Sequence, residues 1–154
     1  MSDTAQEPSR RHVRATERKI LELIDEGVSR SPTFRRLVET LNASDVIVYV
    51  DPKQTRQALG GYLAHNIVAR GGYRYLHIAV EMRGADRRLV ALLAHELQHA
   101  VEVAQDPDAR DEDGLERLFA RLALTFGCGG TSCSETLAAK EVEDAVGDEL
   151  KTAH

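Results

Sequence analysis

Two histidines and a glutamate in the stretch LLAHELQHAVEVA (92–104) have the residue types and the spacing of a catalytic metal site. His95 and His99 are four residues apart, so a helix places both imidazoles on one face, where they can bind one cation. Glu96 lies about a quarter of a turn away, from where its carboxylate can approach a metal-activated water without ligating the metal. The pattern His-Glu-x-x-His therefore predicts a hydrolytic metal site with Glu96 as general base.

The residues around this motif are apolar on nearly every side. Because no wide polar face remains, we expect the helix, over about 87–104, to be buried nearly all round. Buried polar side chains without partners are costly, and a divalent ion would satisfy both imidazoles directly. The alternative is an ordinary buried helix that carries the pattern by chance. The apolar neighbours are Leu89, Val90, Ala91, Leu92, Leu93, Ala94, Leu97, Ala100, Val101, Val103 and Ala104.

A catalytic zinc ion typically needs a third protein ligand and one open position. Residues 100–105 read AVEVAQ, so no His-x-x-Gly-x-x-His continuation supplies a distal histidine. Glu102 lies a turn beyond His99 along the axis, which favours a supporting role over ligation. The last expected helix, over about 134–150, offers a better ligand in Glu135, which lies on its apolar, core-facing stripe.

Two further features of this last helix bear on the role of Glu135. Glu143 and Asp144 lie further round the helical wheel and are expected at the surface. Ser132-x-x-Glu135 also fits a capping box, in which the carboxylate binds only the first amide of the helix. We expect a ligand rather than a cap, because Glu135 faces the core.

HELQH together with the later ETLAA (135–139) resembles the gluzincin branch of the zincin metallopeptidases. The resemblance covers the motif helix, the strand before it and the last helix, about a third of the chain. It implies a minimal zincin-like fold and one Zn²⁺ ion bound by His95, His99 and Glu135. It also implies hydrolysis of peptide bonds, with Glu96 as base and proton shuttle.

The same resemblance raises the question of what orients the histidines. Many gluzincins carry an acidic residue four positions after the ligand glutamate, but this sequence has Ala139 there. The resemblance then implies support from elsewhere, with Glu102 and Glu149 as candidates.

In such folds the strand before the motif helix lines the cleft and pairs with an extended peptide. Tyr73, Tyr75 and His77 share one face of that strand, so they are candidates to line the substrate site. Tyr75 and His77 are also the first candidates to stabilise the oxyanion, although side chains in such positions more often pack or face solvent.

Periodicity predicts the elements that must position these residues. A helix is expected over about 13–26, ended by Gly27, and a second helix after the Ser31 cap and Pro32. A strand over 46–50 and a hairpin that turns at 70–72 make an antiparallel sheet of about three strands. Helices over about 87–104, 115–126 and 134–150 complete an α+β fold. We expect a disordered tail over residues 1–10 and a single zincin-like domain over 11–154.

Composition limits the partners. The 154 residues carry 20 basic and 25 acidic side chains, and this net charge of −5 predicts no attraction to nucleic acid or anionic lipid. No apolar run is long enough for a membrane span. We expect a soluble protein, cytoplasmic as written, or exported if a signal peptide has been removed. Cys128 and Cys133 form either a small disulfide or two free thiols.

The leading hypothesis is a zinc-dependent peptidase acting on a peptide or protein substrate. The alternative is a non-hydrolytic zinc-binding scaffold, or a peptide-binding module, on a zincin fold. A third possibility is a helical domain without metal.

Overall fold

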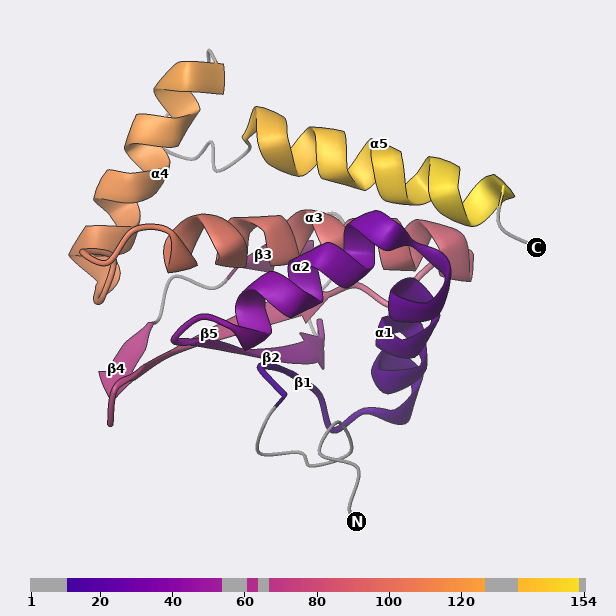
Figure 1. Ribbon diagram of the computed structural model, residues 1–154, viewed down its shortest axis with the longest axis horizontal. Helices are drawn as coiled ribbons and strands as arrows, with labels where there is room; N and C mark the ends of the chain where they lie inside the picture. Colours follow the sequence, from indigo (N-terminus) through magenta and orange to yellow (C-terminus); the bar gives the residue numbers. More distant parts are fainter. Residues whose placement is uncertain (1–10, 54–60, 64–66, 127–135, 153–154) are drawn as a thin grey trace.

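The computed structural model describes residues 11–53, 61–63, 67–126 and 136–152. The architecture is α+β, as the sequence predicts, with the helices on one side of a small sheet (Figure 1). In chain order the elements are β1 (Val13–Arg14), α1 (Arg18–Arg30), α2 (Pro32–Asn42), β2 (Val46–Pro52), β3 (Gly61–Leu63), β4 (Val68–Arg70), β5 (Tyr73–Val80), α3 (Asp86–Ala104), α4 (Glu112–Phe126) and α5 (Leu137–Thr152).

The sheet is mixed, which corrects the expected antiparallel sheet of about three strands. Its order is β1-β2-β5-β3, with β2 parallel to both β1 and β5, and with β3 and β4 antiparallel to β5. The two helices between β1 and β2 supply the long connection that a parallel pair requires. The expected hairpin is confirmed for β4 and β5, where Gly71 and Gly72 both have positive φ in a two-residue turn.

The first helix differs from the expectation at both ends. Val13 belongs to β1, whereas α1 begins at Arg18 and continues through Gly27 to Arg30. Gly27 does not end the helix; it allows close packing, because a Cβ there would lie 2.6 Å from the ring of Phe34 in α2. The predicted start of α2 is confirmed, since the Ser31 hydroxyl accepts the Phe34 N–H at 3.0 Å.

The motif helix α3 is the central layer of the molecule. It lies between the sheet and α5, which runs alongside it (Figure 1). Thirteen of its nineteen residues are buried, so the predicted burial nearly all round is confirmed. Such a helix cannot leave its polar side chains to water, and their partners must come from the protein or from a ligand.

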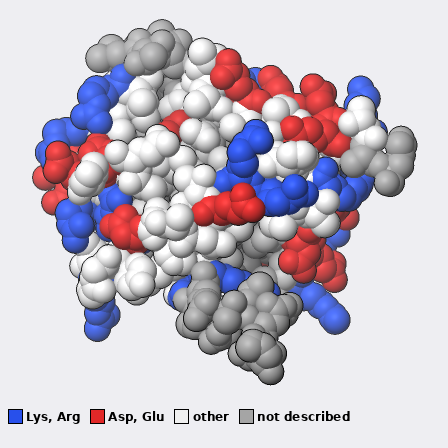
Figure 2. All heavy atoms as spheres, viewed as in Figure 1, with Lys and Arg blue, Asp and Glu red and all other residues white. Residues whose placement is uncertain are grey.

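The surface facing the viewer in Figure 2 mixes both signs of charge, with acidic and basic side chains interspersed. This pattern is consistent with the small net charge. None of the described helices is long and apolar enough to cross a membrane.

One buried arginine of β5 fixes the C-terminal end of α3. Arg74 is 2% exposed, and its guanidinium forms a bidentate pair with Asp45, at 2.8 and 2.7 Å. It also donates to the carbonyls of Val103 and Ala104 at the end of α3, and to those of Asp106 and Ala109 in the following loop. The last carbonyls of a helix lack partners within the helix, so Arg74 acts as a side-chain cap.

Replacing Arg74 by Met should lower the free energy of unfolding by about 3 kcal/mol, because Asp45 and the buried carbonyls lose their donor. The control is Arg88→Met, which removes an exposed arginine bonded to the Arg83 carbonyl and should change stability by less than about 0.5 kcal/mol. Urea unfolding of the two variants measures the difference. Equal losses would show that Arg74 does not anchor α3.

Hydrogen bonds from Arg74 hold the pKa of the Asp45 carboxyl below its ordinary value of 3.8, against the opposing effect of burial. A carboxyl with a lowered pKa stabilises the fold fully above its unfolded pKa, and this contribution is lost as pH falls through the folded pKa. Asp45→Asn should therefore be less stable than wild type at neutral pH, and the difference should shrink between about pH 5 and pH 2. Urea unfolding across this range tests it, with Asp148→Asn on the surface of α5 as control. A difference that stays constant with pH would contradict the prediction.

Candidate metal centre

The three motif residues lie together inside the protein, on the middle of α3. His95, Glu96 and His99 are 5%, 4% and 3% exposed, so all three are removed from bulk water. The two imidazoles are adjacent, with ring centroids 5.0 Å apart. Phe119 of α4 packs its ring edge-to-face against His99 at 5.5 Å, which limits rotation of that imidazole.

His99 is held by a carboxylate from its own helix. Its Nδ1 lies 3.0 Å from Oε1 of Glu102, which is also buried. The other oxygen, Oε2, accepts from the Thr136 hydroxyl at 2.7 Å and from the Gln98 amide at 3.3 Å. Glu102 therefore supports a histidine, as the sequence suggested.

His95 is held by a carboxylate that the sequence analysis placed at the surface. Its Nδ1 lies 2.8 Å from Oε1 of Glu143 on α5. Glu143 is about 40° round the wheel from the buried Ala139, at the border of the core stripe, and its long side chain reaches inward. Its side chain is 31% exposed, so it touches both His95 and solvent.

Glu149, the other expected support, is engaged elsewhere. Its carboxylate accepts from the Ser31 hydroxyl at 2.6 Å, and from the Thr33 amide and hydroxyl at 3.1 and 2.7 Å. Burial alone would raise the pKa of Glu149, but these hydrogen bonds outweigh burial and the pKa lies below its ordinary value of 4.5. Glu149 thus ties α5 to the start of α2 and does not orient a motif histidine.

The two carboxylates define which nitrogen of each histidine carries the proton. A carboxylate oxygen accepts hydrogen bonds, so the Nδ1 facing it carries the proton. A neutral imidazole protonated at Nδ1 keeps its lone pair on Nε2, the nitrogen with which such an imidazole ligates a metal. Within the described ranges, no three His, Cys, Asp or Glu side chains are grouped to hold an ion. Glu135, the expected third ligand, lies outside the described residues.

The start of α5 bears on the competing interpretation of Glu135. The helix begins at Leu137, and its cap is Thr136, whose hydroxyl accepts the Ala139 N–H at 3.1 Å. The capping box of Ser132 and Glu135 lies outside the described residues, as do Cys128 and Cys133.

The expected substrate-lining residues lie away from the motif. The predicted alternation in β5 is confirmed: Leu76, Ile78 and Val80 are buried in the core with α3, as is Arg74, whereas Tyr73, Tyr75 and His77 face the other side of the sheet. There Tyr75 and His77 stack against Tyr49 of β2, with centroids 6.4 and 5.6 Å apart.

The backbone of β5 is also occupied, contrary to its expected pairing with a peptide. One edge pairs with β2 over Arg74–Val80, and the other pairs with β4 and then β3. In the described sheet, β4 and β3 are the edge strands on this side, and β3 also packs against α3.

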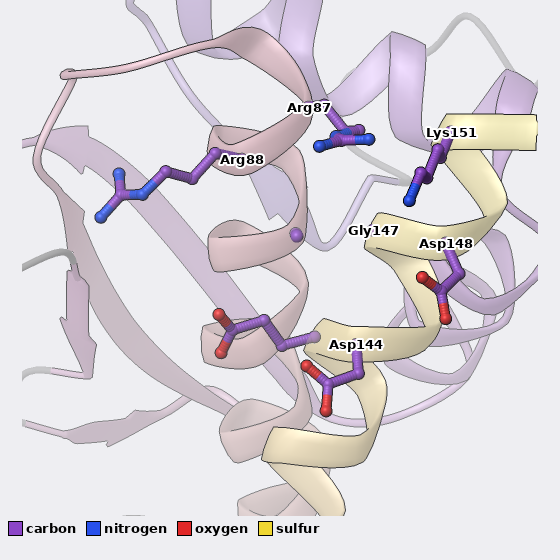
Figure 3. A pocket seen from close by; sticks show the side chains of 8 residues that line it. Arg87, Arg88, Asp144, Gly147, Asp148 and Lys151 are labelled. Atoms are coloured by element: carbon purple, nitrogen blue, oxygen red, sulfur yellow. The ribbon is translucent and has the colours of Figure 1, made fainter.

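A pocket of about 560 Å³ between α3 and α5 reaches Glu143. Arg87 of α3 and Lys151 of α5 lie at the same end of it, whereas Asp144 lies further along α5 (Figure 3). The pocket exposes the carboxylate that supports His95, in contrast to the buried carboxylate that supports His99.

No protein-family model, no curated protein and no solved structure matches this chain.

A zinc ion bound by the two histidines would be held at least tenfold more weakly in Glu143→Ala, because His95 loses the acceptor that fixes its ring and its tautomer. Asp144→Ala is the control, since Asp144 is the next residue of α5, lines the same pocket and does not contact His95. Competition with a coloured chelator measures both affinities. Equal affinities would show that Glu143 does not support a ligand.

Proposed function

We propose that this protein is a zinc-dependent peptidase that hydrolyses peptide bonds with Glu96 as general base. One observation carries the proposal. Two adjacent imidazoles are buried on one helix, and each has its Nδ1 on a carboxylate, at 2.8 and 3.0 Å. Histidines that ligate metals are usually held in this way, with the second nitrogen left for the ion.

The available donors fit a catalytic zinc better than a structural one. Structural zinc sites are usually closed by four ligands rich in cysteine, whereas catalytic sites use three histidine or carboxylate ligands and keep one position open. His95 and His99 would supply two ligands, and we propose Glu135 as the third. Its sequence neighbour Thr136 is bonded to Glu102, which in turn contacts His99. Glu135 directly precedes Thr136 in the sequence, and this adjacency supports the choice of Glu135.

The chemistry then divides between the ion and Glu96. A bound zinc ion would supply Lewis acidity, which polarises the scissile carbonyl and makes water a stronger nucleophile. Glu96 is adjacent in sequence to a proposed ligand and is 4% exposed. A carboxylate in this position accepts the proton of the attacking water and returns it to the leaving amine.

The proposed cofactor is one Zn²⁺ ion. The proposed substrate is an extended peptide or protein segment. Edge strands present unpaired backbone groups that a peptide can extend by β-augmentation. The edge strand beside α3 is β3, so we propose that the peptide pairs there rather than with β5. The net charge of −5 gives no reason to propose a nucleic-acid partner.

The test combines metal analysis with peptide hydrolysis. Purified wild type should hold about one zinc per chain, and His99→Ala should lose it. Glu96→Gln should keep the zinc but lose activity by about a thousandfold or more, because the base is absent while the ligands remain. Elemental analysis and a fluorogenic peptide library measure the two properties.

Each contrary result removes a specific part of the proposal. Wild type without zinc would favour a helical domain without metal. Stoichiometric zinc without any cleavage would favour a zinc-binding scaffold. Retention of zinc by Glu135→Ala would exclude Glu135 as the third ligand.

A further inference from the structure

The hydroxyl of Thr136 lies at the junction of a helix cap and the metal centre. It accepts the Ala139 N–H at 3.1 Å and contacts Glu102 Oε2 at 2.7 Å. Thr136 is 4% exposed and Glu102 is 6% exposed, so water does not compete for these contacts. One small side chain therefore serves both the start of α5 and the support of His99.

These contacts form a series of hydrogen bonds from the Ala139 N–H through Thr136 and Glu102 to His99. The direction of each bond follows from the Ala139 N–H. A backbone N–H can only donate, so the Thr136 oxygen accepts from Ala139 and its single proton points to Glu102. Glu102 Oε2 then accepts, both from Thr136 and from the Gln98 amide. A carboxylate fixed as an acceptor leaves Oε1 to receive the proton of His99 Nδ1.

We infer that Thr136 is a positioning residue whose hydroxyl, oriented by the cap of α5, holds the Glu102 carboxylate where it accepts the proton of His99 Nδ1. Nε2 of His99 is then left with its lone pair. The role of this tautomer in zinc binding rests on the proposed function, whereas the tautomer itself does not.

The chain contains a matched control for this role. Ser31 also caps a helix, accepting the Phe34 N–H at 3.0 Å, and it also donates to a glutamate, Glu149, at 2.6 Å. That glutamate contacts no histidine in the described structure. Loss of the Ser31 hydroxyl removes the same kind of cap and the same kind of donor, away from the metal centre.

Thr136→Val keeps the shape of the side chain and removes the hydroxyl, so it should weaken zinc binding about tenfold. Thr136→Ser retains the hydroxyl and should restore affinity to within about twofold of wild type. Ser31→Ala should lower the midpoint of thermal unfolding comparably to Thr136→Val, yet leave zinc affinity unchanged. Competition with a chelator and thermal melts measure both quantities. Equal weakening by Ser31→Ala, or none by Thr136→Val, would overturn the inference.

Glu102→Gln is the variant that tests the tautomer of His99 most directly. The amide oxygen would accept from Thr136 and Gln98, so its NH₂ group would face His99 Nδ1 and force the proton onto Nε2. Zinc affinity should then fall by about a hundredfold.

Long-range ¹⁵N NMR of the metal-free protein reads the tautomer directly, with the His99 signal assigned by its absence in His99→Ala. Wild type should carry the proton on Nδ1, and Glu102→Gln on Nε2. A wild-type proton on Nε2 would overturn the inference, even if zinc binds. A wild type with the expected tautomer that binds no zinc would instead defeat the proposed function alone.

Discussion

The position of α3 depends on Arg74. Its guanidinium is almost completely buried, and it joins Asp45 before β2 to four carbonyls at and beyond the end of α3. A buried guanidinium is tolerated only when its N–H groups have hydrogen-bond acceptors. Here the acceptors are the Asp45 carboxylate and the four backbone carbonyls. Because Arg74 belongs to the inner strand β5, the sheet and the motif helix are fixed to one another at this end.

Because α3 is fixed at one end and buried, its polar side chains need hydrogen-bond partners inside the protein. The side of α3 that carries the motif histidines meets α5 rather than water, so its partners must be supplied from α3 itself or from α5. Glu102 and Glu143 meet this requirement for His99 and His95, and Thr136 satisfies Glu102. The support of the two histidines therefore depends on the packing of α5. A change that moved α5 would take Glu143 away from His95, and Thr136 away from Glu102, the partner of His99.

Local patterns predicted the parts of the fold that depend on local geometry. The burial of α3, the Ser31 cap and the alternation of β5 follow from spacing along one element, and the structure confirms them. The mixed sheet and the partner of His95 depend on how distant elements pack. On a helical wheel Glu143 is at the edge of the apolar stripe, and only the position of α5 against α3 turns it inward. The expected role of Glu149 in supporting a histidine was wrong for the same reason. Its partners Ser31 and Thr33, at the start of α2, are distant in sequence.

The supports of the two histidines differ in their exposure to solvent. Ala139 is completely buried where α5 begins, so a carboxylate at that position would have to fit into the packing. Four residues later, Glu143 lies one helical turn along the same side of α5 and reaches His95 from the rim of a pocket. Glu102 supports His99 from inside α3, closed off from solvent. The two histidines thus have unequal supports. The orientation of His99 is fixed by buried hydrogen bonds, whereas that of His95 depends on a carboxylate that solvent or a ligand in the pocket can reach.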